Sequence, residues 1–329
     1  MLRTAVIGVG HLGRQHARIH NALTVEGLSH LVSVCDTNSE TAASIAREWK
    51  AGWATDWREL IGKVDAVSIA VPTESHCVIA CGLLENGIHV LVEKPISRTL
   101  EEADRMIAAA TEGNAVLQVG HLERFNPAMV ALYPHVRNPV YFEIHRVGQF
   151  TARSLDIDVV LDVMIHDLDI VQWLVGEQVD VTNIHAVGIA ILTDRVDAAN
   201  VRLEFSSGAV ANITASRVGT EKIRKMRFFQ PHDYIAIDYT TKRASISSLA
   251  PPAADGAWPG VHVKNLDIND IEPLRAEIVA FFEAARGGLP SPVSGIDGRN
   301  ALALALRTLE RIREHAQHPG VSGLARVNS

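Results

Sequence analysis

The stretch TAVIGVGHLG, residues 4–13, joins a short apolar run to three glycines and so decides the first half of the fold. Gly8 would permit a tight turn, Gly10 would let the backbone approach a pyrophosphate, and Gly13 would allow close packing of helix on strand. The N-terminus of the following helix would face the phosphates. Alone the motif is weak, because any cluster of turn-forming glycines looks similar.

A carboxylate follows at the expected place. The second predicted strand, 31–36, ends in Asp36, which lies 23 residues beyond Gly13. A carboxylate there accepts hydrogen bonds from the adenosine ribose and repels a ribose phosphate. The next residue is Thr37 and not an arginine, so the sequence favours NAD over NADP as the cofactor.

Short apolar runs alternate with longer amphipathic segments over the first 120 residues. This alternation is typical of βαβ units around a parallel sheet. The expected strands are 4–9, 31–36, 65–72, 89–94 and 115–120, and the expected helices lie near 12–23, 39–48, 75–86 and 99–112. The fold class is therefore α/β, with a doubly wound Rossmann domain at residues 1–120.

The pattern changes after residue 120. Helices are expected near 126–136, 159–175, 270–286 and 297–315, and the extended runs between the second and third of these are joined by short polar links. Such links are typical of an antiparallel sheet. We expect residues 121–329 to form an α+β domain with a large, mainly antiparallel sheet.

Composition excludes several classes of protein. The chain has 329 residues, 47% hydrophobic and 21% charged, which is ordinary for a globular protein. A net charge of -7 gives no reason to expect nucleic acid or an anionic membrane as a partner. Cys35, Cys77 and Cys81 form no C-x-x-C pair, so neither a metal site nor a disulfide framework is expected. A cytoplasmic location is expected.

A lysine stands at the end of an apolar strand in VLVEKPISRT, residues 90–99. Ligands of open parallel sheets bind outside the carboxyl ends of the strands, so Lys94 would lie near the nicotinamide. An ammonium there can polarise a hydroxyl or help to move a proton. The alternative is a solvated lysine that caps the strand end.

A second polar group interrupts the apolar helix predicted over 159–175. Asp162 and His166 are four residues apart, which places them on one helix face, and Asp169 continues the stripe. A carboxylate beside an imidazole on an apolar helix is costly unless both groups have partners or a chemical role. A satisfied core histidine remains the alternative.

These motifs resemble the Gfo/Idh/MocA oxidoreductases over nearly the whole chain. The resemblance rests on GVGHLGRQHA, VPTESH, VEKP, ERFNP and DVMIHDLD, in that order along the sequence. It implies a Rossmann domain, an open-faced sheet domain at residues 121–329 used for substrate binding and oligomerisation, NAD as cofactor, and homodimers or homotetramers formed through that sheet. It also implies that the bond between Lys94 and Pro95 is cis.

The resemblance assigns roles to particular residues. Lys94, Asp162 and His166 would surround the reacting carbon, with Lys94 or His166 transferring the proton. Substrate contacts would come from His121, Arg124, Asn126 and His166, although Arg124 could equally form a structural ion pair and Asn126 a helix cap. The expected cofactor contacts are Gly8, Gly10, His11, Leu12, Gly13, Asp36, Thr37, Pro72, Thr73, His76, Glu93 and Lys94.

Within the family, GHLERFNPA and DVMIHDLDI look most like the branch that oxidises the 3-hydroxyl of UDP-N-acetylglucosamine. An inositol or free-sugar dehydrogenase is the first alternative, and a non-catalytic NAD-binding regulator is the second. Lys222, Arg224, Lys225 and Arg227 could bind a diphosphate, or they could be the solvated surface of a strand or loop.

Overall fold

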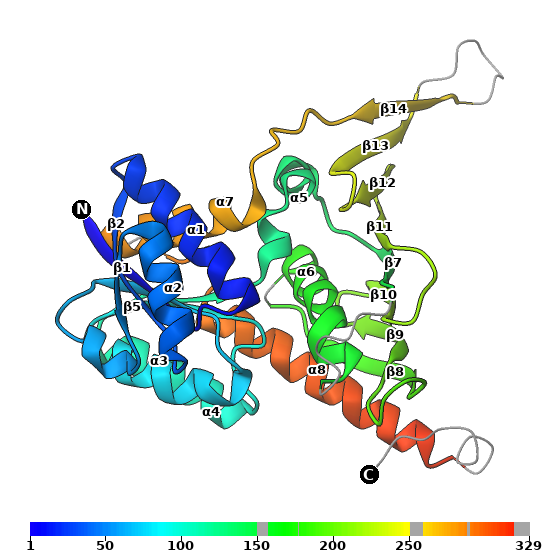
Figure 1. Ribbon diagram of the computed structural model, residues 1–329. Helices are drawn as coiled ribbons and strands as arrows, with labels where there is room; N and C mark the ends of the chain where they lie inside the picture. Colours follow the sequence, from blue (N-terminus) through cyan, green and yellow to red (C-terminus); the bar gives the residue numbers. More distant parts are fainter. Residues whose placement is uncertain (150–156, 177, 251–258, 288–289, 319–329) are drawn as a thin grey trace. The chain divides into compact units, whose positions relative to one another are not determined.

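The computed structural model describes residues 1–149, 157–176, 178–250, 259–287 and 290–318 (Figure 1). The chain divides into two compact units. The first contains residues 1–122 and 272–302, and the second contains the described residues within 123–271 together with the rest of the last helix.

The first unit is built on a six-stranded parallel sheet with the order β3-β2-β1-β4-β5-β6. Its strands are β1 (Leu2–Ile7), β2 (Ser29–Cys35), β3 (Gly52–Ala54), β4 (Ala66–Ile69), β5 (His89–Glu93) and β6 (Leu117–Gly120). This is the strand order of a dinucleotide-binding fold. The sequence predicts every strand except β3, a short edge strand in which Gly52 and Trp53 are exposed.

Helices follow the strands as predicted. They are α1 (His11–Val25), α2 (Ser39–Trp49), α3 (His76–Leu84) and α4 (Leu100–Glu112), with short 3₁₀ turns at Trp57–Leu60 and Thr73–Ser75. The side chains of Asn38 and Thr99 cap the N-termini of α2 and α4 by accepting the N–H groups of Thr41 and Glu102. Such caps stabilise a helix by about 1 kcal/mol each.

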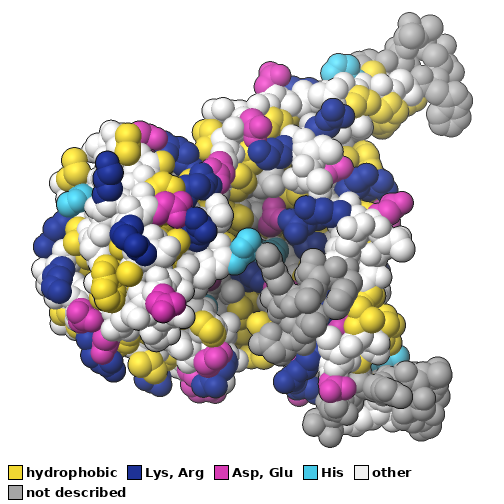
Figure 2. Space-filling model, in the orientation of Figure 1, with side chains coloured by type: hydrophobic (Ala, Val, Ile, Leu, Met, Phe, Trp, Pro, Cys, Tyr) yellow, Lys and Arg dark blue, Asp and Glu magenta, His cyan; other side chains and the backbone are white. Residues whose placement is uncertain are grey.

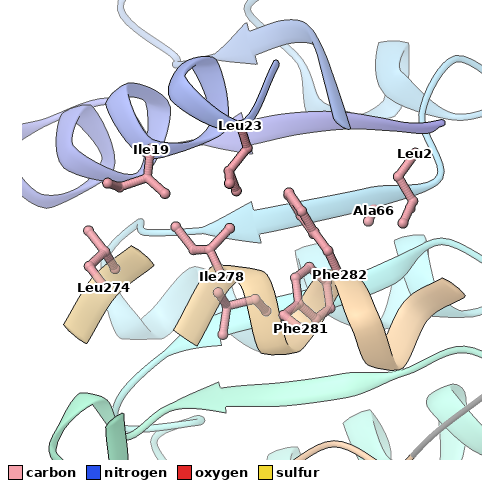
Figure 3. Close-up of a cluster of buried hydrophobic side chains, with 9 residues drawn as sticks. Leu2, Ile19, Leu23, Ala66, Leu274, Ile278, Phe281 and Phe282 are labelled. Atoms are coloured by element: carbon pink, nitrogen blue, oxygen red, sulfur yellow. The ribbon is translucent and has the colours of Figure 1, made fainter. Parts of the chain in front are cut away.

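A segment from late in the sequence completes the core of the first unit. Helix α7 (Pro273–Gly287) contributes Leu274, Ile278, Phe281 and Phe282 to a buried cluster that also contains Leu2, Ile19, Leu23 and Ala66. In Figure 3, Ile278 and Phe282 point toward Ile19 and Leu23 of α1. Burying side chains of this size contributes about 1.5–3 kcal/mol each. The expected division into 1–120 and 121–329 therefore differs from the structure, in which residues 272–302 return to the first unit.

The second unit holds an eight-stranded sheet with the order β14-β13-β12-β11-β7-β10-β9-β8. Only the β7 and β10 pair is parallel among these neighbours, so the prediction of a mainly antiparallel sheet is confirmed. The strands are β7 (Tyr141–Val147), β8 (Val181–Ile189), β9 (Ala198–Phe205), β10 (Val210–Ser216), β11 (Ile223–Gln230), β12 (Asp233–Asp238), β13 (Arg243–Leu249) and β14 (Val261–Asn265).

Strand alternation gives this sheet a buried face and an exposed face. Phe142 and Ile144 of β7 are buried with Met226 and Phe228 of β11, while Phe229 is 44% exposed. The helices of this unit include α5 (Pro127–Leu132) and α6 (Ile165–Val175), and α8 (Gly295–Ala316) runs from the first unit into the second. Short 3₁₀ turns lie at Leu122–Phe125 and Tyr133–His135.

The helix predicted over 159–175 is present but is not uniform. Val160–Met164 form a π-helical turn that leads directly into α6, and the helix stops at Gly176, whose φ is 114°. Residues 157–165 contain no proline or glycine, so the sequence does not predict the wider turn. Single π turns inside α-helices are frequent at functional sites.

Candidate functional site

The glycine loop after β1 has the geometry that its spacing predicts. Gly8 has φ +79°, and a Cβ there would lie 2.6 Å from the carbonyl oxygen of Ala70. A Cβ on Gly13 would lie 1.6 Å from the carbonyl oxygen of Gly8. Position 8 therefore requires glycine for its backbone conformation, and position 13 requires glycine because the backbone of Gly8 lies so close.

Open space and free donors meet at the start of α1. A Cβ on Gly10 would meet no atom within 4 Å, and no side chain caps the helix. The first turn contains no acidic residue, and His11 and Leu12 are exposed there. Uncapped N–H groups and the helix dipole favour an anion, so this loop fits a pyrophosphate. A cleft of about 650 Å³ beside it is lined by Val9, Gly10, His11, Arg14, Gln15, Glu40, Thr41, Ser44 and Ile45.

Asp36 is fixed in position directly after β2. Its Oδ2 accepts the N–H of Val9 at 2.9 Å, and its Oδ1 accepts the N–H of Asn38 at 2.9 Å. The carboxylate is half-buried and lies beside the glycine loop, and Thr37 next to it is exposed. This arrangement fits the ribose-binding role and supplies a negative charge where NADP would carry a phosphate.

The segment after β5 carries Lys94. Glu93 accepts a hydrogen bond from Nε2 of His16 at 2.9 Å. Burial opposes the Glu93 charge, but this hydrogen bond and the nearby positive groups lower its pKa. Lys94 is half-buried and precedes a cis proline bond, as the resemblance implies.

The loop after β4 approaches the same segment. His76 is 1% exposed, with Nε2 at 3.0 Å from the carbonyl oxygen of Val71 and Nδ1 at 3.1 Å from that of Pro95. Burial lowers the pKa of this imidazole. A neutral imidazole donates from one ring nitrogen only, so His76 hydrogen-bonds one of the two strand-end loops and packs against the other. Pro72 and Thr73, before it, are exposed and half-buried respectively, and a role for these residues toward the cofactor stays a prediction.

Asp162 and His166 lie on either side of the change from π turn to α-helix in the second unit. Both are half-buried, whereas their neighbours Met164, Ile165 and Asp167 are buried. Both groups are thus partly accessible, and a proton-transferring residue must be able to reach its substrate.

The expected substrate contacts are enclosed. Arg124 donates two hydrogen bonds to Asp169, at 2.8 and 2.6 Å, and its guanidinium lies 5.2 Å from the ring centre of Trp173. Asn126 caps α5 by accepting the N–H of Ala128, and it donates to Glu123. The structure thus contains the ion pair and the cap that the sequence left as alternatives. His121 is 1% exposed, directly after β6.

A second buried ion pair was not anticipated from the sequence. Arg146 donates to Asp167 at 2.7 Å through Nε and to Glu123 at 2.6 Å through Nη1, and it lies over the ring of Tyr239. Burial opposes its charge, but the two carboxylates outweigh this and raise the pKa of Arg146. The sequence predicts that each acid on the apolar helix 159–175 needs a partner. It does not predict which residue supplies that partner.

The basic cluster at the start of β11 is divided by strand alternation. Arg224 lies on the face of Met226 and Phe228, whereas Lys225 and Arg227 lie on the opposite face. The second face has a groove of about 470 Å³ whose lining also includes Glu143, Glu221 and Asp238. Lys222 and Arg224 also border this groove, so the four cations of the cluster line one groove of mixed charge.

Surface charge, helix apolarity and the grouping of metal-binding side chains were the remaining features of the described residues that bear on function. In Figure 2, Lys and Arg side chains are interspersed with Asp and Glu over the visible face. Within the described residues no helix has the length and apolarity needed to cross a bilayer. The same residues contain no group of three or more His, Cys, Asp or Glu side chains placed to bind a metal ion.

Comparison with known proteins identifies the family. Residues 2–121 match the family described as "Oxidoreductase family, NAD-binding Rossmann fold", and residues 102–229 match the "GFO/IDH/MocA C-terminal domain". The chain is 40% identical over 308 residues to UDP-N-acetylglucosamine 3-dehydrogenase of Acidithiobacillus ferrooxidans, covering 93% of this chain and 96% of that protein. It is 31% identical over 235 residues to scyllo-inositol 2-dehydrogenase (NAD(+)) of Bacillus subtilis, covering 66% and 67%.

Solved structures agree with this result. The Acidithiobacillus ferrooxidans enzyme superposes with a TM-score of 0.88 at 38% identity, covering 96% of this chain and 99% of that one. Levoglucosan dehydrogenase in complex with NADH has the same fold, with a TM-score of 0.82 at 21% identity and coverage of 95% and 97%. The chain therefore belongs to the Gfo/Idh/MocA family of NAD-binding oxidoreductases.

Proposed function

We propose that the chain oxidises the 3-hydroxyl of UDP-N-acetylglucosamine to a ketone, with NAD as the acceptor. The supporting observation is the 40% identity that extends over 93% of the chain to an enzyme with this activity. The inositol dehydrogenase of Bacillus subtilis matches less of the chain, at 31% identity over 66%. Fold alone does not choose between these substrates.

NAD would be held by the glycine loop and Asp36, and when bound it supplies a two-electron acceptor. His166 takes the proton of the substrate hydroxyl as general base, and Asp162 orients its imidazole. Lys94 orients and polarises the same oxygen. The half-buried state of all three side chains supports these roles, because each is partly shielded from water but still accessible. Lys94 as the base is the alternative assignment.

A substrate panel tests this proposal. NADH formation is followed at 340 nm with UDP-N-acetylglucosamine, N-acetylglucosamine, myo-inositol and scyllo-inositol at equal concentrations. We expect the nucleotide sugar to give the highest kcat/KM by a wide margin. Preference for an inositol would instead support the polyol dehydrogenase, and NAD binding without turnover of any of these would support a regulator.

Single substitutions then separate the two candidate bases. Lys94→Ala and His166→Ala should each lower kcat, and the residue that transfers the proton should cost about 10² to 10⁴ in rate. His30→Ala is a matched control, since this exposed histidine belongs to β2 and has no assigned role. A Lys94→Ala enzyme with near wild-type turnover would exclude the lysine from catalysis.

We also propose a cytoplasmic homodimer or homotetramer formed through the exposed face of the eight-stranded sheet, with no nucleic acid or membrane partner. Apolar side chains on that face support this proposal, including Val187, Ile189 and Phe229, which are 43%, 41% and 44% exposed. Light scattering after size exclusion should show an oligomer for the wild type and a smaller species for Phe229→Asp. A monomeric wild type would contradict the proposal.

A further inference from the structure

Three buried arginines of the second unit are matched by carboxylates, and they differ in this from Arg224, an exposed arginine near the start of β11. Arg124, Arg146 and Arg217 each place Nε within 2.8 Å of an aspartate oxygen. The side chain of Arg224 donates no hydrogen bond to any residue within the described part of the chain. Its guanidinium is therefore the one among these four whose donors remain available to a ligand.

Arg224 lies close to the candidate catalytic helix. It stands directly opposite Arg146 in the pairing of β11 with β7, and Arg146 holds Asp167. Asp167 immediately follows His166 in α6, and the charges of Asp167 and Glu123 act on Arg224. These contacts place Arg224 on the same side of the second unit as the N-terminal turn of α6.

A second positive charge, that of Arg146, acts on Arg224. Partial burial, and then the positive charge of Arg146, lower the pKa of Arg224. Asp167 and Glu123 oppose this effect, but their oxygens already accept hydrogen bonds from Arg146. A phosphate would supply acceptor oxygens that match the planar fork of a guanidinium in two parallel hydrogen bonds.

We propose that Arg224 binds the diphosphate of the nucleotide-sugar substrate. The inference rests on the proposed function, and it names the group that would distinguish a nucleotide sugar from a free sugar. The diphosphate is attached to C1, which a single ring carbon separates from C3, so a site that oxidises C3 must meet the diphosphate nearby. Arg224 supplies a cation with free donors beside the helix that carries His166.

The other cations of the cluster are less suited to this role. Lys225 forms an ion pair with Asp238 at 3.7 Å on the opposite face, where Arg227 also lies. The groove that Lys225 and Arg227 line together with Lys222 and Arg224 also contains Glu143, Glu221 and Asp238, and these carboxylates oppose a diphosphate bound inside it. Arg227 is therefore a matched control, because it is an exposed arginine of the same strand on the other face.

Calorimetric titration of UDP into the NAD-loaded protein tests the proposal without relying on turnover. Arg224→Gln should weaken UDP binding by about tenfold to a hundredfold, the range for one charge-assisted hydrogen-bonding group. Arg224→Lys should recover part of this loss because it restores the charge but not the fork. Arg227→Gln should bind UDP as the wild type does.

Kinetics supply a readout that a purely structural role would not give. Arg224→Gln should raise the KM for UDP-N-acetylglucosamine while leaving kcat/KM for N-acetylglucosamine, NAD affinity and Tm unchanged. Wild-type UDP affinity in Arg224→Gln, or an equal loss in Arg227→Gln, would overturn the assignment of Arg224 and leave the proposed function standing. A wild-type protein that neither binds UDP nor oxidises UDP-N-acetylglucosamine would instead contradict the proposed function, and this inference with it.

Discussion

Replacing Glu277 with glutamine should change how stability depends on pH. Glu277 of α7 is fully buried, on the helix face that carries Leu274, Ile278 and Phe281, and its carboxyl oxygens have no hydrogen-bond partner among the described residues. Burial, and then the charge of Glu93, raise its pKa well above the ordinary value. We therefore expect the folded protein to keep this carboxyl protonated where the unfolded chain has released its proton.

The sign follows from proton linkage. Above the ordinary carboxyl pKa, the unfolded chain binds fewer protons than the folded protein at this position, so the free energy of unfolding falls as pH rises. The fall is about 1.4 kcal/mol per pH unit until the folded group itself titrates. Glu277→Gln keeps the shape of the side chain but cannot ionise. The free energy of unfolding of the variant should therefore rise relative to that of the wild type by about 1.4 kcal/mol for each pH unit in this range.

Urea unfolding at pH 5, 6, 7 and 8 measures this difference. Fluorescence of Trp49, Trp53 and Trp57 reports on the first unit, which contains Glu277. Glu283→Gln is the control, because Glu283 lies on the same helix but is exposed, and its slope should match the wild type. A stability difference between Glu277→Gln and wild type that stays constant over this range would refute the reasoning.

Three further changes have defined outcomes. Gly13→Ala places a Cβ 1.6 Å from the Gly8 oxygen, so it should cost about 1–3 kcal/mol in urea unfolding and weaken NAD binding measured by calorimetry. Asp36→Ala should lower the ratio of the NADP dissociation constant to the NAD dissociation constant by about tenfold, because it removes a charge that repels the ribose phosphate. An unchanged ratio would exclude Asp36 from selecting between the two cofactors. Asp167→Asn removes the charge of the more buried of the two carboxylates that pair with Arg146, so it should lower the free energy of unfolding, measured with urea, by about 3–5 kcal/mol.

The two fold classes were predictable because their patterns are local. Apolar β-branched runs separated by amphipathic segments predict a parallel sheet, and the alternation in residues 223–230 predicts a half-buried strand. The return of α7 to the first unit was not predictable in this way. An apolar stripe on a helix indicates that one face is buried, but it does not indicate which core buries it.

The site was predictable in part for the same reason. The glycine loop and Asp36 depend on neighbouring elements, and their geometry follows from the motif. The partner of Asp169 is Arg124, which lies 45 residues away, and that of Asp167 is Arg146, which lies 21 residues away. Only the folded chain brings such groups together, so spacing could indicate that these acids need partners but not which residues supply them.

The position of the transferred hydrogen tests the central claim most directly. The protein is incubated with NAD and UDP-N-acetylglucosamine deuterated at C3, and both products are analysed by mass spectrometry and NMR. We predict deuterium at C4 of the nicotinamide, slower turnover than with unlabelled substrate, and a UDP-sugar ketone at C3. Deuterium retained at C3 of the sugar while NADH forms would contradict the account.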